Sequence, residues 1–217
     1  MRLESRLISD FQWLHSGAQK DSREENTVKP YTQKLSLAGG LVLAACTGAL
    51  AADFTLTSSA FKDGTMLAKK NAGAVKTNPN CVGENVSPPL SWANPPAGTK
   101  SYALLMIDPE GRNGLGVIHW LAYNIPADVH GFAEGETSQP SPKYTGGKGT
   151  AGQATYMGPC TPVGAPHHYT FTLVATDLDP GALPAGLTYP ELIGKLEGHG
   201  KGGTGLIGLW QNPSTGK

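Results

Sequence analysis

The sequence predicts a mainly β fold with one or two short helices. Three apolar runs have the length of buried strands, at residues 102–107, 117–125 and 169–177. Only the segment 187–198 carries apolar residues at helical spacing, with Pro190 near its start. The 29 glycines and 17 prolines indicate many turns and irregular loops, and neither an internal repeat nor a coiled-coil heptad occurs.

The other elements are assigned from alternation, proline and glycine. In chain order we expect an alternating opening strand at 54–58, a polar loop or loosely paired stretch at 62–80, a proline-containing edge segment at 85–92, a turn at 95–98, a flexible glycine loop at 111–116, a turn region at 126–135, the longest loop at 136–156 and a short final strand at 206–210. The run 102–107 ends at Asp108, which places this carboxylate at a strand–loop junction.

Length and charge suit one compact domain with additional sequence. The chain has 217 residues, of which 39% are hydrophobic and 16% are charged. Residues 53–217 contain eleven Lys and Arg and twelve Asp and Glu side chains, and no basic stripe is present. We therefore expect no nucleic-acid partner.

The N-terminal region has the parts of a secretory signal peptide. An apolar run over residues 35–51 follows Lys29 and Lys34 and ends in Ala49-Leu50-Ala51. The run is short for a membrane span, and a buried core helix is the alternative. We divide the chain into an N-terminal extension (1–34), a signal region with its cleavage site (35–52) and a mature domain (53–217). This predicts a periplasmic or secreted protein without a transmembrane span in the mature chain.

Two alternatives remain open in this region. Leu43-Ala44-Ala45-Cys46 fits the cleavage pattern of bacterial lipoproteins, so a lipid anchor at Cys46 is the alternative to release. Val28 stands where a signal peptide of ordinary length would begin, so a translation start at Val28 is a second hypothesis.

Two cysteines, Cys81 and Cys160, lie within the expected mature domain. In an exported chain they can close one disulfide, and two partly buried thiols are the alternative. Neither belongs to a Cys-x-x-Cys motif, so we expect no metal bound through them.

Two short polar blocks carry most of the chemical information. The first is Asp108-Pro109-Glu110 followed by His119-Trp120, and the second is Gly158-Pro159-Cys160-Thr161-Pro162 followed by His167-His168-Tyr169. If the fold brings the blocks together, they form a small polar pocket for an anionic or zwitterionic head group. Taken singly, Asp108 can cap a turn and His119 can be a hydrogen-bonded core histidine.

Neighbouring residues on a strand point to opposite sides. We therefore expect His167 to face the pocket and His168 to be structural or at the surface. Trp92 and Trp120 are expected in the core.

The order of the blocks resembles the phosphatidylethanolamine-binding protein family. The motif Cys81-x-Gly-x-Asn85-x-Ser87-Pro88-x-Leu90-x-Trp92 precedes the first block, Asn124-Ile125-Pro126-Ala127 follows it, and the second block matches the family's second signature. Within the family, the chain is most similar to the bacterial Raf kinase inhibitor-like branch. The resemblance covers about residues 53–212, and several blocks recur in the right order.

The resemblance implies an antiparallel β-sandwich with an anion-binding pocket at one end. By the family's pattern the pocket residues are Asp108, Glu110, His119, Gly158, Pro159, His167 and Tyr169, and the usual ligands carry phosphate. The chemistry agrees, because imidazole, phenol and backbone N–H groups donate to an oxyanion and carboxylates suit an amine or orient histidines. No cofactor and no metal are expected.

One departure from the family's pattern concerns the first block. The family usually reads Asp-Pro-Asp-x-Pro, whereas this chain reads Asp108-Pro109-Glu110-Gly111-Arg112. Glutamate is one methylene longer, and loss of the second proline removes a rigid turn element. Arg112 adds a cation at the pocket rim that can bind an anion bidentately, so it joins the expected ligand-binding residues.

Three functional hypotheses follow. The first is an exported binding protein for phosphate-like anions or phospholipid head groups that is not an enzyme. The second is an interaction protein that inhibits a protease or a kinase, with a partner the sequence does not name. The third is a hydrolase using Asp108, Glu110 and His119 on a bound water, although neither a Gly-x-Ser-x-Gly nor a His-Glu-x-x-His motif is present.

Overall fold

The computed structural model describes residues 52–213. The predictions for the N-terminal extension, the signal peptide and Cys46 lie outside the described residues. In chain order the elements are β1 (Thr55–Thr57), β2 (Thr65–Met66), the 3-10 helix η1 (Lys69–Asn71), β3 (Leu90–Ala93), β4 (Ser101–Asp108), α1 (Gly111–Gly114), β5 (Val117–Pro126), β6 (Gly131–Phe132), the 3-10 helix η2 (Glu136–Ser138), β7 (Thr145–Gly146), β8 (His167–Thr176), α2 (Tyr189–Leu196) and β9 (Gly200–Trp210).

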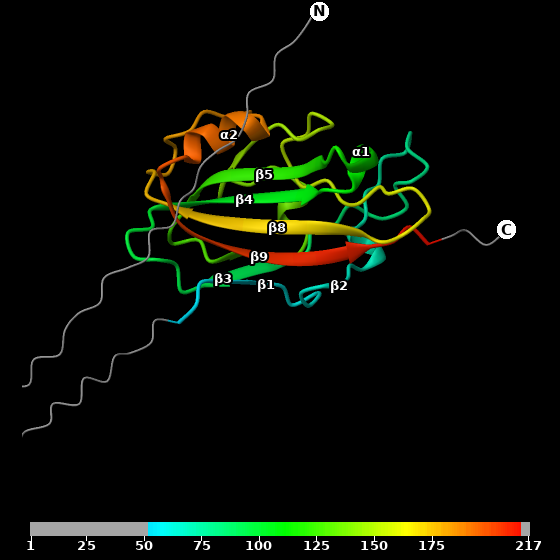
Figure 1. Cartoon of the computed structure of the whole chain (residues 1–217), viewed down its shortest axis with the longest axis horizontal. Coiled ribbons are helices and arrows are strands. Elements are labelled where there is room, and N and C mark those ends of the chain that lie inside the picture. The colour runs from blue at the N-terminus through cyan, green and yellow to red at the C-terminus, as the bar shows by residue number, and fades with distance from the viewer. Residues whose placement is uncertain (1–51, 214–217) are drawn as a thin grey trace, which may run out of the picture. The chain divides into compact units, whose positions relative to one another are not determined.

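Two sheets form the described domain. The larger has the strand order β2-β9-β8-β4-β5-β7, and the smaller has the order β1-β3-β6 (Figure 1). All pairings are antiparallel except that of β2 with β9. The predicted mainly β fold with one or two short helices is confirmed, and the two-residue parallel strand β2 is an addition to it.

Strand β4 lies at the centre of the larger sheet, between β5 and β8. Successive side chains of a strand point to opposite faces. Tyr102, Leu104 and Met106 therefore join the core shared with the smaller sheet, whereas Ala103 and Leu105 pack beneath α2. Burial on both faces explains why the sequence of β4 is a continuous apolar run.

The predicted tryptophans lie in the core between the sheets. Trp92 of β3 and Trp120 of β5 both pack on Phe132, with ring centroids 5.5 and 5.8 Å from the Phe132 ring. Trp92 and Trp120 are each at most 4% exposed.

Strands β8 and β9 begin earlier in the chain than predicted. β8 begins at His167, and β9 begins at Gly200 rather than Leu206. Glycine is a poor strand former, so the glycine-rich stretch 200–205 gave no local signal. It nevertheless pairs with β8, for example Thr204 with Leu173, because hydrogen bonds to a neighbouring strand override local propensity.

Several expected loops contain short elements. β2 and η1 form within 62–80, β6 within 126–135, and η2 and β7 within 136–156. The expected loop at 111–116 contains the single turn α1 and closes with a hydrogen bond from Gly116 N–H to the Gly111 carbonyl, N···O 2.9 Å.

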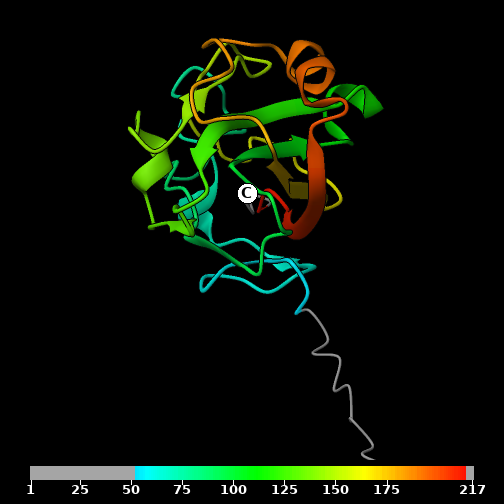
Figure 2. The same cartoon turned by 90° about the vertical axis from the view of Figure 1, so that its left-hand side faces the viewer.

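Helix α2 lies within the segment 187–198 for which a helix was predicted, so that prediction is confirmed. It starts with a capping box in which the Glu191 carboxylate accepts the Thr188 N–H at 2.8 Å. Figure 2 shows α2 lying over the outer face of the larger sheet. Among residues 52–213, no helix is both long and apolar enough to cross a bilayer.

Candidate functional site

A cavity of about 470 Å³ lies where β4 ends and β8 begins. Its walls come from the turn around α1, from β5, from the segment that carries Cys160 and from the start of β8. Of the residues expected from the sequence, the cavity is lined by Asp108, Glu110, Arg112, His119, His167 and Tyr169. The fold therefore brings the two polar blocks together.

Asp108 is the last residue of β4 and is only 2% exposed. Its Oδ1 accepts the N–H groups of Glu110 and Gly111 at 3.0 and 2.9 Å, which shapes the turn after the strand. Its Oδ2 accepts a hydrogen bond from Nδ1 of His167 at 2.9 Å. One buried carboxylate thus fixes both the turn into α1 and the orientation of an imidazole on β8.

His119 is a buried residue of β5. It is both a hydrogen-bonded core histidine and a residue that borders the cavity. Its Nδ1 lies 2.8 Å from the carbonyl oxygen of Met157. A carbonyl oxygen only accepts, so Nδ1 carries the proton and Nε2 of the neutral ring is an acceptor. Burial lowers the pKa of His119, against the opposing influence of the Met157 bond and of Asp108. The ring is therefore a satisfied core histidine that also borders the cavity.

Tyr169 lies edge-on to His119, with ring centroids 5.0 Å apart. Its side chain is fully buried, and its hydroxyl has no hydrogen-bond partner among residues 52–213. Burial, followed by the negative charge of Asp108, raises the pKa of the Tyr169 phenol. The hydroxyl therefore stays protonated, as a buried donor beside the Asp108 carboxylate and beneath the cavity wall.

Glu110 is held by His168, which the sequence reasoning left outside the site. The Glu110 carboxylate accepts from His168 Nδ1 at 2.7 Å and from its backbone N–H at 3.2 Å. Partial burial raises the pKa of Glu110, but the bonds from His168 outweigh it and the net direction is downward. His167 and His168 do point to opposite sides of β8, yet each holds one carboxylate of the cavity.

Arg112 occupies the left-handed region of backbone space, with φ 54° and ψ 43°. Asn113 beside it has φ 60°. Proline is locked near φ −65°, so the family's second proline is incompatible with this turn. Within the described chain, Arg112 forms no ion pair or side-chain hydrogen bond with another residue, and its side chain borders the cavity. The departure in sequence thus accompanies a departure in backbone conformation.

Gly158 and Pro159 support the cavity wall but do not line the cavity itself. The Gly158 N–H donates to Asn85 Oδ1 at 2.8 Å, and the Pro159 carbonyl accepts from Gly73 N–H at 2.8 Å. A side chain at Gly158 would collide with the backbone of residues 71–73. The expectation that Gly158 and Pro159 line the pocket is therefore corrected: this segment packs against the preceding loop, and Cys160 and Thr161 border the cavity instead.

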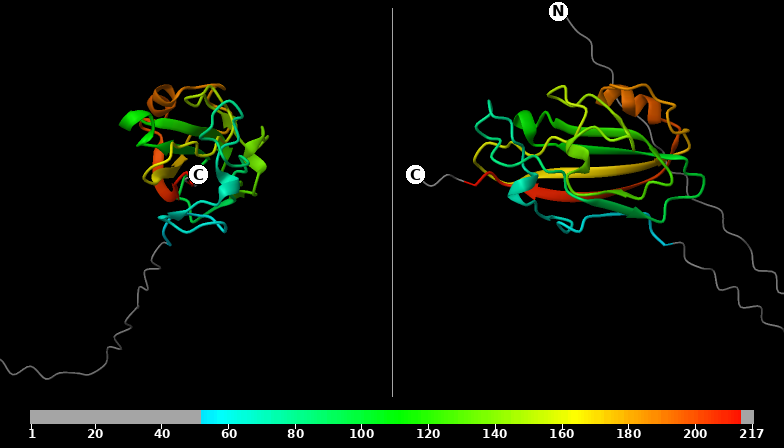
Figure 3. Two further views of the ribbon diagram at one scale, coloured as in Figure 1. Left: turned by 90° about the vertical axis from the view of Figure 1, so that its right-hand side faces the viewer. Right: turned by 180° about the vertical axis from the view of Figure 1, so that it is seen from behind.

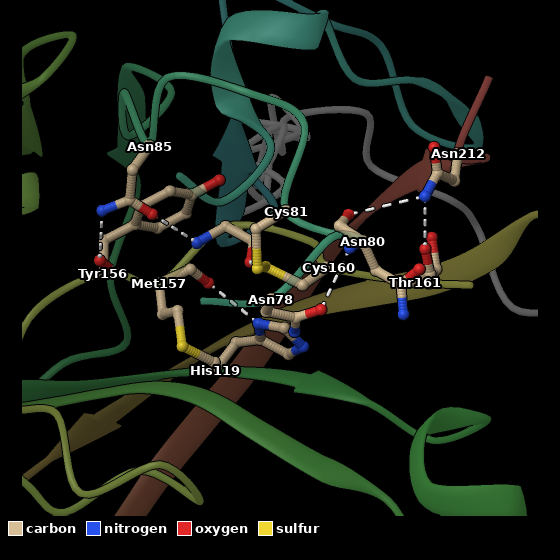
Figure 4. The surroundings of a disulfide bond; sticks show 11 residues. Asn78, Asn80, Cys81, Asn85, His119, Tyr156, Met157, Cys160, Thr161 and Asn212 are labelled. Atoms are coloured by element: carbon tan, nitrogen blue, oxygen red, sulfur yellow. Dashed lines mark hydrogen bonds between the residues drawn. A yellow bond between two sulfur atoms is a disulfide. The ribbon is translucent and has the colours of Figure 1, made fainter. Parts of the chain in front are cut away.

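A disulfide joins Cys81 to Cys160, with Cα atoms 4.4 Å apart (Figure 4). The structure therefore contains the disulfide and not two partly buried thiols. Asn212 adds a second tie between the same segments, because its Nδ2 donates to the Thr161 carbonyl at 2.8 Å and points toward that of Asn80 at 3.5 Å.

Sequence reasoning missed the asparagines that border or brace the cavity, which are Asn78, Asn80, Asn85 and Asn212. Asn85 entered the sequence analysis only as part of the family motif, and Asn78, Asn80 and Asn212 carry no local signal because asparagine is common in surface loops.

Three side chains at the cavity also have the atoms that could bind a metal cation. Ligand atoms of Asp108, Glu110 and His167 all lie within 4.8 Å of one another. Each carboxylate already accepts from a histidine, so the hydrogen bonds account for this proximity without a metal.

Comparison with known proteins agrees with the resemblance in sequence. A family model described as phosphatidylethanolamine-binding protein matches residues 57–211. The chain belongs to the phosphatidylethanolamine-binding protein family. Its mainly β fold is that of a member of this family.

Three relatives illustrate the branch. The chain is 37% identical over 148 residues to a UPF0098 protein of Methanothermobacter thermautotrophicus, covering 64% of this chain and 91% of the relative. It is 36% identical over 172 residues to a Mycobacterium tuberculosis protein provisionally named lipoprotein LppC, covering 76% and 75%. The crystal structure of Escherichia coli YbcL, described as a new member of the mammalian PEBP family, is similar with a TM-score of 0.65 and 28% identity, covering 74% of this chain and 99% of that one.

We predict that removing the disulfide lowers stability. Cys81 and Cys160 are 79 residues apart, so replacing both by serine should lower the free energy of unfolding by about 4 kcal/mol, chiefly by releasing the unfolded chain. Urea unfolding followed by tryptophan fluorescence measures the change. The reduced wild type is the control and should behave like the variant; equal midpoints for oxidised wild type and variant would contradict the prediction.

We also predict a pH-dependent contribution from His119. Because its pKa is lowered in the folded protein, the unfolded chain binds a proton first as the pH falls below about 6.5. Stability from the neutral ring is thus present above that pH and is lost below it, by at most about 1.4 kcal/mol per pH unit. The comparison is His119→Asn, whose amide can still donate to Met157.

Unfolding curves at pH 8, 6.5, 5.5 and 5 test this prediction. The stability difference between wild type and His119→Asn should shrink as the pH falls. Parallel stability profiles for the two proteins would exclude it.

Proposed function

We propose that this protein binds a small phosphate-bearing ligand, of the kind found in phospholipid head groups, in the cavity at the end of β4 and β8. The observation that carries the proposal is the cavity itself, which is bordered by the guanidinium of Arg112, without an ion-pair partner in the described chain, and by the imidazoles of His119 and His167. The Tyr169 hydroxyl lies beneath the same wall and has no hydrogen-bond partner within 3.5 Å among the described residues, so a ligand oxygen that reaches it gains a donor.

The charges around the cavity support an anion beside a second, cationic group. Arg112 contributes a guanidinium without an ion-pair partner in the described chain, and such a fork matches two phosphate oxygens. Asp108 and Glu110 are each engaged by a histidine, which reduces their repulsion toward an anion. The same carboxylates suit the amine of a zwitterionic head group. The cavity of about 470 Å³ falls within the range typical of small-molecule sites.

We propose binding without chemical turnover. The hydrolase hypothesis needs Asp108, Glu110 and His119 to act on a water, but both carboxylates are engaged by histidines, which leaves Nε2 of His119 as the acceptor for a water proton. The buried pair of Asp108 and His167 has the arrangement of a carboxylate that orients an imidazole, which also serves to position a donor. A phosphate-release assay with phosphate monoesters separates binding from hydrolysis.

We further propose that the chain is exported. The signal-peptide pattern of residues 35–51 supports this, and the disulfide between Cys81 and Cys160 suits an oxidising compartment. A relative that carries a lipoprotein name supports the alternative with a lipid at Cys46.

We predict opposite effects of Tyr169→Phe on stability and on binding. The substitution removes a hydroxyl that has no partner, so the unfolding midpoint should stay the same or rise. Removal of one donor to a charged oxyanion should weaken binding of phosphate or phosphoethanolamine by about ten- to a hundredfold. Isothermal titration and thermal unfolding measure the two quantities on the same samples.

The matched control is Tyr156→Phe. The Tyr156 hydroxyl is also fully buried, but it donates to the Asn71 carbonyl at 2.7 Å, so this variant should lose stability. If wild type binds none of phosphate, phosphoethanolamine and a short-chain phospholipid, the proposed function is wrong.

We predict that the mature N-terminus distinguishes release from anchoring. Cleavage after Ala51 or Ala52 gives an unmodified chain that begins near Asp53, whereas lipidation gives an acylated chain that begins at Cys46. Intact mass measurement of protein purified from a bacterial envelope fraction decides between them. An intact chain that retains residues 35–51 would contradict export.

A further inference from the structure

The end of the domain that holds the cavity also carries most of its exposed apolar side chains. Five large apolar residues are exposed among residues 52–213. Four lie on segments at this end, namely Met66, Val75, Leu115 and Val163, whereas Ile193 lies on α2. Figure 1 and the views in Figure 3 show α1 and the cavity-end loops at the end of the domain away from α2.

Three loops combine these apolar residues with the cavity wall. The loop 73–80 exposes Val75 and lines the cavity through Asn78 and Asn80. The loop 111–116 lines it through Arg112 and exposes Leu115, which is 78% accessible. In the loop 161–166, the 62% exposed Val163 itself borders the cavity. The apolar residues therefore surround the cavity mouth.

Met66 belongs to the same end by strand register. It pairs with Leu209 of β9, which in turn pairs with His168 of β8. His168 holds Glu110 of the cavity, so β2 lies two strands away from the site.

The charges of the three loops all have one sign. Residues 73–80, 111–116 and 161–166 contain Lys76 and Arg112 and no carboxylate, and Glu110, which directly precedes the second loop, is engaged by His168. Exposed aliphatic side chains beside cations are the composition that enters the interface of a phospholipid bilayer, where the apolar groups reach the acyl region and the cations remain among the phosphates.

We propose that this end of the molecule docks on a phospholipid bilayer, so that the head group enters the cavity directly from the membrane surface. The proposal rests on the proposed function, because the cavity must accept a phosphate-bearing head group. A second copy of the chain is a poorer occupant. It would bring Lys76 and Arg112 of both copies to one interface, and the adjoining carboxylate of Glu110 is already engaged by His168.

The test is flotation of the full-length protein with vesicles of phosphatidylethanolamine and phosphatidylcholine. The variant Leu115→Ser with Val75→Ser removes two apolar residues that do not line the cavity. Its vesicle affinity should fall by at least about tenfold, since burying one such side chain is worth a factor of this order. Ile193→Ser, on α2, is the matched control and should bind like wild type. Residues 1–51 are common to all the proteins, so any contribution from them cancels in the comparison.

Titration with phosphoethanolamine in solution separates the two proposals. The double variant should bind it as wild type does. If wild type binds phosphoethanolamine but does not float, or if the double variant and Ile193→Ser float equally well, docking is overturned and the proposed function stands. If wild type does not bind phosphoethanolamine, the proposed function itself fails. Light scattering that detects a dimer which the double variant dissociates would identify a second copy as the occupant and overturn docking.

Discussion

The buried carboxylate of Asp108 is the constraint on which the site depends. A charge in the interior is costly unless hydrogen bonds satisfy it, and here three donors converge on one side chain. Two of them belong to the backbone of the following turn, and the third is the His167 imidazole of β8. The direction in which the chain leaves β4, the position of α1 and the orientation of the His167 ring therefore depend on one residue. A neutral side chain at this position would leave these donors without their charged acceptor.

Much of the fold could be read from the sequence because its central strands are buried on both faces and appear as apolar runs. The extent of β9 could not, because a run of glycines is held in the sheet by its partner β8, and pairing over long distances leaves no local trace. The same reason applies to the site. Residue type and order identified Asp108, His119 and Tyr169, but the contact of Glu110 with His168 depends on how β8 lies against the turn at α1.

The segment Glu110-Gly111-Arg112 combines a change of residue with a change of backbone. A left-handed Arg112 is strained, and strain of this kind persists where the surroundings hold it in place. Here the bonds from the backbone to Asp108 and the close of the turn at Gly116 do so. The longer side chain of Glu110 meanwhile reaches His168 on the neighbouring strand. The two differences from the family's pattern therefore act together. Glu110 places its carboxylate against His168 at the cavity rim, and Arg112 supplies a cation.

The disulfide has a topological consequence for the site. It closes a covalent ring that contains residues 81–160, and within this ring lie Asp108, Glu110, Arg112 and His119. His167, His168 and Tyr169 lie beyond it, on a strand attached to the ring by hydrogen bonds to β4 and by the two histidine–carboxylate contacts. One half of the candidate site thus lies inside the disulfide-closed ring, and the other half lies on the chain that follows Cys160. Reduction of the bridge would therefore remove a covalent constraint from the half that carries Asp108 and Glu110, while the half on β8 would keep its pairing with β4 and β9.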